Sequence, residues 1–151
     1  MTLVESSKLK GKVEYLYKKL EPLISAKIKD YTFEHIGSTS IVGCLTKGDI
    51  DFYLEVEPKD HQNVIKKLLE LGFKVKVDTH RDKSLCMLQN SECAIQVVSK
   101  GSKYEFFKVF RDKLNENPEM VSQYNQIKMS SQHLSDDDYR KNKAKFILSV
   151  L

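Results

Sequence analysis

The sequence predicts a single α+β domain over residues 1–151, with a short mixed β-sheet, helices on one side of it and a helical C-terminal region. Apolar residues recur at helical spacing towards both ends of the chain and alternate with polar residues in its middle part. No repeat, low-complexity tract or linker divides the 151 residues, a length that allows one domain with a substantial core.

The first predicted elements are a helix and a short strand. Apolar positions at helical spacing indicate a helix over residues 8–29. Pro22 lies inside this pattern and should kink or restart the helix, because proline lacks the amide hydrogen that the helix needs. Residues 32–36 then fit a strand, which ends in a small, polar loop of residues 37–40.

The clearest strand covers residues 49–56, where apolar and polar side chains alternate strictly. One face is apolar: Ile50, Phe52, Leu54 and Val56. The other face carries the carboxylates: Asp49, Asp51, Tyr53 and Glu55. Because successive side chains of a strand point to opposite faces, the first face predicts a core surface and the second a polar surface.

The remaining elements follow from turn and capping signals. A helix over residues 58–71 ends at Gly72, and a strand follows over residues 73–77. Residues 84–89 and 92–98 form two strands joined by a tight turn. From residue 103 the pattern is helical, with Asn117 capping one helix and Ser135 beginning a capping box for the last.

Composition narrows the class of protein. The three cysteines, Cys44, Cys86 and Cys93, lack zinc-ligand spacing and are expected to be reduced. Neither a membrane-spanning stretch nor a leader is recognised, which predicts a cytoplasmic protein without a membrane partner. A formal net charge of +4 is compatible with an anionic ligand and too small to indicate a nucleic-acid partner.

Two neighbouring motifs carry the chemistry. A glycine-serine turn lets the backbone approach a phosphate closely, and hydroxyl and amide groups can donate hydrogen bonds to it. The expected phosphate contacts in this loop are Gly37, Ser38, Thr39 and Ser40. Asp49 and Asp51 are two residues apart, about 6.6 Å along a strand, so both carboxylates can reach one Mg²⁺ or Mn²⁺ ion. Either motif alone is more often a plain turn or a solvated surface.

Residues 35–51 resemble the signature of the GrpB-like family, a branch of the nucleotidyltransferase superfamily with the DNA polymerase β-like fold. The stretch His-Ile-Gly-Ser-Thr-Ser beginning at His35 matches the family pattern without a gap, as do Gly43, Lys47 and Asp51. The resemblance continues in the last third of the chain. The matching residues there are Phe110, Arg111, Asp112, Leu114, Pro118, Tyr124, Lys128, Tyr139, Lys143, Phe146 and Ile147. It implies a minimal nucleotidyltransferase fold with a ligand cleft between the sheet and the C-terminal helices.

The sequence also departs from the family pattern. Val42 and Gly48 replace prolines, and Asp49 stands where the family usually has an apolar residue, which completes the Asp-x-Asp pair of active nucleotidyltransferases. The third carboxylate of active members comes from a neighbouring strand, where this chain has Gln96 as the polar residue. Glu92 shares that face but lies four residues away, about 13 Å along a strand.

Further candidates are weighed against ordinary structural roles. Lys47 is a candidate phosphate ligand, and Lys143 on the basic last helix is a candidate for the ligand cleft, although a basic helix face is usually just solvated. His35 is expected to orient the loop by a hydrogen bond rather than to act in catalysis. His80 and His133 have no evident partner in the sequence.

These residues together predict a nucleotide- and magnesium-binding protein that transfers a nucleotidyl group to a small-molecule or protein hydroxyl. Its partners are then a nucleoside triphosphate and an acceptor that the residues do not specify; they also leave the base specificity and the oligomeric state open. Because Gln96 cannot act as a base, a catalytically inactive nucleotide-binding or partner-docking module is the alternative. A third reading is that the resemblance reports the fold alone.

Overall fold

A computed structural model describes residues 2–151. Its strands are β1 (Val4–Glu5), β2 (Tyr31–Ile36), β3 (Leu45–Thr46), β4 (Asp51–Val56), β5 (Lys74–Val75), β6 (Leu85–Gln89) and β7 (Ala94–Ser99). Its α-helices are α1 (Lys10–Ser25), α2 (His61–Glu70), α3 (Phe106–Asn115), α4 (Pro118–Ser130) and α5 (Asp136–Val150). Single turns of 3₁₀-helix are η1 (Ser6–Leu9), η2 (Ser38–Ser40), η3 (Pro58–Asp60) and η4 (Lys103–Glu105).

The main sheet has five strands in the order β2-β4-β7-β6-β5. β4 and β7 are parallel, and the other neighbours are antiparallel, so the sheet is mixed as predicted. A separate two-stranded sheet pairs β1 with β3 and brings the start of the chain beside the segment between β3 and β4. The predicted α+β class is confirmed.

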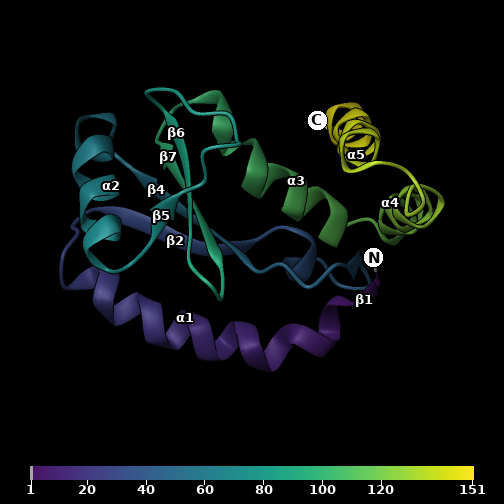
Figure 1. The fold of residues 1–151 in the computed structure, drawn as a ribbon, viewed down its shortest axis with the longest axis horizontal. Helices are drawn as coiled ribbons and strands as arrows, with labels where there is room; N and C mark the ends of the chain where they lie inside the picture. The colour runs from purple at the N-terminus through teal and green to yellow at the C-terminus, as the bar shows by residue number, and fades with distance from the viewer. Residues whose placement is uncertain (1) are drawn as a thin grey trace.

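One face of the sheet is sealed by α1 and α2 (Figure 1). The apolar side chains that alternate along β4 point into this core, where Phe52 and Leu54 are 0% exposed. Leu16, Leu20 and Ile24 of α1 pack against them. Burial of this apolar surface, worth roughly 25 cal/mol per Å², holds the helices on the sheet.

The opposite face is covered only in part. α3 crosses it and the C-terminal helices α4 and α5 stand beyond α3, away from the sheet (Figure 1). Tyr104, Phe106 and Phe107 pack near the start of α3 on the sheet residues Ile36 and Tyr53. The C-terminal helices have their own core, in which Tyr124 and Phe146 stack at 5.0 Å between ring centroids. The sheet and the C-terminal helices are therefore joined through α3.

Capping and turn predictions are confirmed in detail. The Asn117 side chain accepts hydrogen bonds from two backbone amides of α4, and the Ser135 side chain accepts one from Asp138. Gly72 follows α2 with a φ of 97°, the left-handed conformation expected of a C-terminal cap. Cys44, Cys86 and Cys93 are free and buried.

Several boundaries differ from the predictions. The helix of the first third passes through Pro22 and ends three residues later at Ser25, so proline does not restart it. β5 covers only Lys74–Val75, and Val77 is exposed, because the chain leaves the sheet there. β4 begins at Asp51, two residues later than predicted, because its pairing with β2 ends at that residue. Asp49 therefore lies in the loop that enters β4.

Glu55 lies on the same face as Asp51 and Tyr53, as predicted, but this end of the face is covered. Its side chain is buried and accepts hydrogen bonds from the Tyr53 hydroxyl at 2.7 Å and from Lys108 at 3.0 Å. α3 covers this end of the face, and alternation alone does not reveal such a cover. Among residues 2–151 no helix is long and apolar enough to cross a membrane.

Candidate functional site

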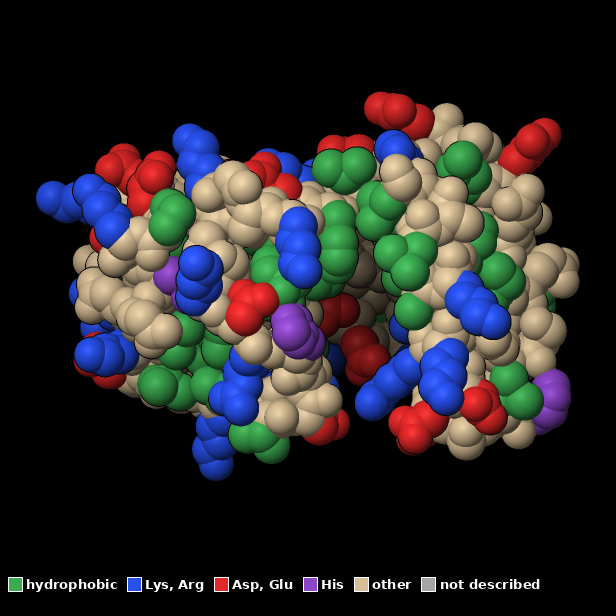
Figure 2. Space-filling model, turned by 90° about the horizontal axis from the view of Figure 1, so that it is seen from above, with side chains coloured by type: hydrophobic (Ala, Val, Ile, Leu, Met, Phe, Trp, Pro, Cys, Tyr) green, Lys and Arg blue, Asp and Glu red, His purple; other side chains and the backbone are tan. Residues whose placement is uncertain are grey.

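A cleft separates the sheet from the C-terminal helices, as the sequence predicted. Figure 2 shows this hollow between the two parts of the molecule, with acidic side chains at its base and lysine or arginine side chains beside it. Its volume is about 810 Å³. At one end it adjoins a small, polar pocket of about 50 Å³ where both predicted motifs meet.

Gly37 joins the two motifs. Its φ of 78° is a conformation that residues with a side chain rarely adopt, and a Cβ atom added there would lie 2.8 Å from the Asp51 carboxylate. The glycine therefore lets the loop after β2 close against the start of β4. Both Gly37 and Ser38 line the cleft.

The other hydroxyl groups of this loop are used within it. Ser40 donates a hydrogen bond to the carbonyl of Gly37 at 2.6 Å, and Thr39 pairs with His35 at 2.7 Å. Burial, with the nearby Arg111 guanidinium, lowers the pKa of His35 to about 4, so its ring is neutral at pH 7. The expected hydrogen bond from His35 to the loop is thus present. Thr39 and Ser40 shape the loop and are not among the residues that line the cleft.

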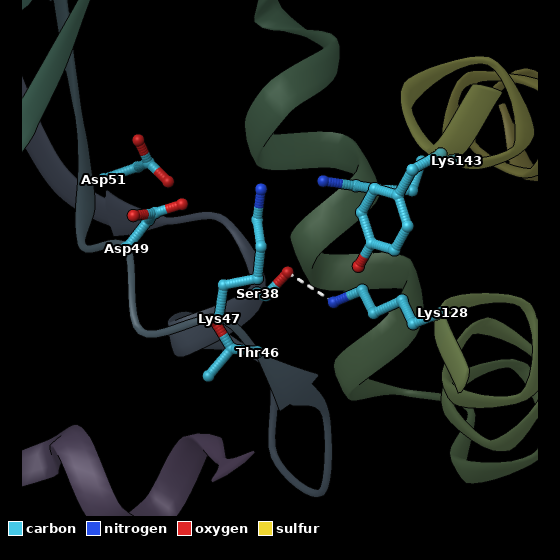
Figure 3. Close-up of a pocket in the computed structure, with 8 residues that line it drawn as sticks. Ser38, Thr46, Lys47, Asp49, Asp51, Lys128 and Lys143 are labelled. Atoms are coloured by element: carbon cyan, nitrogen blue, oxygen red, sulfur yellow. Dashed lines mark hydrogen bonds between the residues drawn. The ribbon is translucent and has the colours of Figure 1, made fainter. Parts of the chain in front are cut away.

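Asp49 and Asp51 stand together at the base of the cleft (Figure 3). Asp51 lies at the first position of β4, and Asp49 is exposed in the preceding loop. Burial, together with the neighbouring charge of Asp49, raises the pKa of Asp51 to about 6. A cation between the two carboxylates would relieve this repulsion.

Three lysines from different parts of the chain line the same small pocket as these carboxylates. Lys47 comes from the loop after β3, Lys128 from the end of α4 and Lys143 from α5; all line the small pocket with Ser38. The side chains of Lys47 and Lys143 point towards it in Figure 3. Burial and the charge of Lys47 lower the pKa of Lys143. Lysines that crowd one another in this way form a favourable site for a polyanion.

Lys128 is the most deeply placed of the three, at 1% exposed. It donates hydrogen bonds of 2.6 Å to the Ser38 hydroxyl and to the Leu45 carbonyl, and it lies 4.2 Å from the Tyr124 ring centroid. Burial lowers its pKa to about 8. The sequence showed Lys128 only as a family match, because nothing near it in the chain carries a ligand-binding pattern.

The position of the third carboxylate is occupied by neutral residues. β7 runs parallel to β4 and pairs Ala94 with Asp51, and Gln96 with Tyr53. Gln96 lines the cleft on the same face as Asp51, as predicted. Glu92 lies at the rim, where its carboxylate forms an ion pair with Lys19 of α1 at 3.4 Å.

Side chains of α3 and α4 hold the end of β2 and the loop after it in place. Arg111 of α3 bonds to the His35 carbonyl at 3.0 Å and to Glu34 at 2.7 Å. Asn115 and Asn125 each donate to one backbone carbonyl of residues 40–45 and accept from one amide there. Neither asparagine was predicted from the sequence, since contacts across 73–82 residues leave no local signal.

His80 has two hydrogen-bond partners, whereas the sequence indicated none. Its Nε2 lies 2.9 Å from the Tyr104 hydroxyl and 3.2 Å from the Asp82 carboxylate. The Tyr104 hydroxyl also donates to Asp82. The three side chains fasten the loop before β6 to η4, at the edge of the cleft. His133 is exposed, as expected.

The donor set fits a magnesium or manganese ion of the kind that nucleotide-binding sites use. Mg²⁺ is commonly bound by one or two carboxylates, with water and substrate phosphates completing its shell. Asp49 and Asp51 supply the two carboxylates, and their mutual repulsion favours a cation. Within residues 2–151 no group of three or more His, Cys, Asp or Glu side chains is placed to hold a metal ion.

Comparisons with known proteins show which sequences this chain resembles. The family model described as "GrpB protein" matches residues 5–151. A UPF0157 protein of Vibrio cholerae is 44% identical over 154 residues, which cover 100% of this chain and 82% of that protein.

Solved structures show the same fold. The conserved protein GrpB from Enterococcus faecalis matches with a TM-score of 0.68 and 18% identity, over 98% of each chain. The Cid1 poly(U) polymerase bound to MgATP matches with a TM-score of 0.59 and 12% identity, over 87% of this chain and 43% of Cid1. The fold is therefore nucleotidyltransferase-like.

Proposed function

This chain belongs to the GrpB family, and we propose that it binds a nucleoside triphosphate with Mg²⁺ or Mn²⁺ in the cleft and transfers the nucleotidyl group to an acceptor hydroxyl. One observation carries the proposal: Ser38 and three lysines line a single small pocket together with Asp49 and Asp51. Cationic side chains and a hydroxyl suit the phosphate oxygens, and the adjoining carboxylates suit the accompanying cation. The likeness in fold to Cid1, which was solved with MgATP, supports the same reading.

In the proposed site the chain's own residues hold the phosphates. Lys128 and Ser38 are already connected by a 2.6 Å hydrogen bond, so the deepest cation and the loop hydroxyl are positioned before a ligand arrives. Lys47 and Lys143 flank the phosphates on two sides. The negative charge of the phosphates then reduces the repulsion among the lysines. A divalent cation held by Asp49 and Asp51 would neutralise phosphate charge and polarise the α-phosphate.

In the transfer, the acceptor oxygen forms a bond to the α-phosphorus while the bond from this phosphorus to the oxygen that bridges to the β-phosphate breaks. Pyrophosphate leaves with the bonding electrons and stays against the lysines, and the acceptor proton passes to water in the open cleft. Since Ala94 and Gln96 stand where a third carboxylate would help to activate the hydroxyl, we expect slow turnover.

The second candidate is a binding module without catalysis. It is favoured by the same neutral residues on β7 and by Glu92, whose carboxylate pairs with Lys19 instead of pointing freely into the cleft. In this case the protein keeps the phosphate pocket as a nucleotide sensor or as part of a docking site.

Calorimetric titration with each nucleoside triphosphate, with and without Mg²⁺ or Mn²⁺, tests both candidates. Asp49→Asn and Asp51→Asn should lose the metal-dependent part of binding, whereas Asp137→Asn, an exposed acid on α5, should keep it. Release of pyrophosphate in the presence of trial acceptors supports the transferase, and metal-dependent binding without release supports the sensor. Absence of binding to every triphosphate would reject both.

A further inference from the structure

The cleft extends beyond the carboxylate pair onto the open face of the sheet. Asp49 and Asp51 line both the small pocket and the larger cleft, as do Ser38, Lys47 and Lys143, whereas Lys128 lines only the small pocket and Gln96 only the larger cleft. The carboxylates, with the ends of Lys47 and Lys143, therefore lie where two regions of different chemistry meet. The small pocket is cationic and suits phosphates. The larger cleft beyond the carboxylates is lined by other kinds of side chain.

The floor of the second region is largely uncharged. It consists of the side chains of Ala94 and Gln96 on β7 and Met87 on β6, on the same sheet face as Asp51. At its edge Lys76 pairs with Asp78 at 3.5 Å, so their charges compensate each other. This floor itself offers no complementary charge to a strongly charged ligand, although Lys12, Glu92 and Arg140 also line the larger cleft.

An aromatic wall stands beside this floor. Phe106 and Phe107, at the start of α3, line the larger cleft and are only partly buried. Their rings meet edge to face, with 4.5 Å between centroids, and Tyr104 supports Phe106 at 6.2 Å. Partly exposed, well-supported rings in a cleft offer a surface on which a flat ring can stack.

Gln96 adds a polar group that the protein itself does not use. It is partly exposed, and its side chain has no hydrogen-bond partner within residues 2–151. The amide presents one acceptor oxygen and a donor NH₂ group side by side. This arrangement matches a heteroaromatic edge that carries a donor next to an acceptor, as adenine does.

The direction of the reaction connects these groups to the acceptor. In an in-line displacement the attacking oxygen approaches opposite the leaving group. With pyrophosphate on the lysines of the small pocket, the acceptor oxygen must approach from the other side of the carboxylates. That side is the region with Gln96 and the aromatic wall.

We propose that this region is the acceptor subsite and that it binds a hydroxyl-bearing molecule through a planar heteroaromatic ring, packed against the rings of Phe106 and Phe107 and hydrogen-bonded by Gln96. The assignment of this ligand as the acceptor rests on the proposed function. The preference for a flat ring rests only on the lining of the cleft. This preference means that neither a simple sugar nor a serine side chain, which lack a flat ring, is the best ligand of the region.

Calorimetry on the full chain with three probes separates these points: adenosine as a hydroxyl-bearing ring, ribose as its ring-free part and tripolyphosphate for the lysine pocket. We expect adenosine to bind and ribose not to bind. Gln96→Leu and the double variant Phe106→Leu/Phe107→Leu should each weaken adenosine binding at least tenfold. Tyr15→Leu, which removes an exposed aromatic ring on α1, is the matched control and should leave it unchanged.

Tripolyphosphate binding shows whether the variants remain folded at the other end of the cleft, and it should be the same in all of them. Failure of adenosine to bind, or equal binding by the cleft variants and the control, overturns the ring subsite. Failure of tripolyphosphate to bind the unaltered protein overturns the proposed function instead. The two failures are therefore distinguishable.

Discussion

The two faces of the sheet come from the same strands and differ in cover. On β4, Phe52 and Leu54 point to the face that α1 and α2 seal, and both are fully buried. Asp51 and Tyr53 point to the other face, which α3 covers at one end and leaves open at the cleft. A two-residue period along one strand thus supplies a core surface and part of the lining of the cleft.

The open face itself shows what cover does to a carboxylate. Glu55 lies where α3 covers the sheet, and it bonds to the Tyr53 hydroxyl and to Lys108. Asp51 lies at the cleft end of the same strand, and its carboxylate makes no hydrogen bond or salt bridge within residues 2–151. Its pKa is raised to about 6 by burial and by Asp49. The carboxylate under α3 is satisfied by the fold, whereas the carboxylate at the cleft is left without a hydrogen-bond or ion-pair partner among residues 2–151.

The largest expected effect is on the sealed face. Leu54→Ala should lower the free energy of unfolding by about 2–5 kcal/mol, because it leaves a cavity in a fully buried layer. Gln96→Ala, on the cleft face of the neighbouring strand, should cost less than about 1 kcal/mol. Urea unfolding of both variants measures the difference. Similar losses would show that the cleft face is packed like the core.

The second effect has the opposite sign. A carboxyl whose folded-state pKa is raised to about 6 from 3.8 is destabilising once ionised, so its cost is absent below about pH 4 and complete above pH 7. Asp51→Asn should therefore raise the free energy of unfolding at pH 7.5 by roughly 1–3 kcal/mol, and hardly at all at pH 4. Urea unfolding at both pH values tests this, with the exposed Glu14→Gln as control. An equal effect at both pH values would contradict it.

The third effect concerns the phosphate end of the cleft. Since the pKa of Lys128 is lowered to about 8, the lysine loses its proton as the pH rises from 7 to 9. The affinity for tripolyphosphate should fall up to about tenfold over this range, because one pH unit above the pKa only about a tenth of the lysine is charged. Lys128→Met should bind more weakly and show a smaller pH dependence, because Lys143, whose pKa is also lowered, remains in the pocket. An unchanged pH dependence in the variant would assign it to another group.

The smallest effect is expected at the rim. The ion pair between Glu92 and Lys19 is half exposed, and such pairs contribute about 0.2–1 kcal/mol. Glu92→Gln should therefore change the unfolding free energy by less than about 1 kcal/mol. It should also leave metal-dependent triphosphate binding unaltered in calorimetry. A loss of that binding would restore Glu92 as the third carboxylate.

Much of the local structure could be predicted from the sequence, because it depends on neighbouring residues. Alternation identified β4 and its core face, and Asn117, Ser135 and Gly72 identified helix ends through their own hydrogen bonds or backbone conformation. The ends of several strands and helices were predicted less accurately. Asp49 lies outside β4 because strand pairing, which involves a distant segment, decides where a strand begins.

By itself the sequence determined the corner at which the loop of residues 37–40 meets Asp51, since a short connection and a glycine suffice to close it. Only the tertiary structure decided what faces that corner. Lys128 and Lys143 come from helices far along the chain, and the parallel register of β7 places Ala94, with no carboxylate, beside Asp51. Helix docking and strand register depend on packing across the whole domain, so no local pattern encodes them.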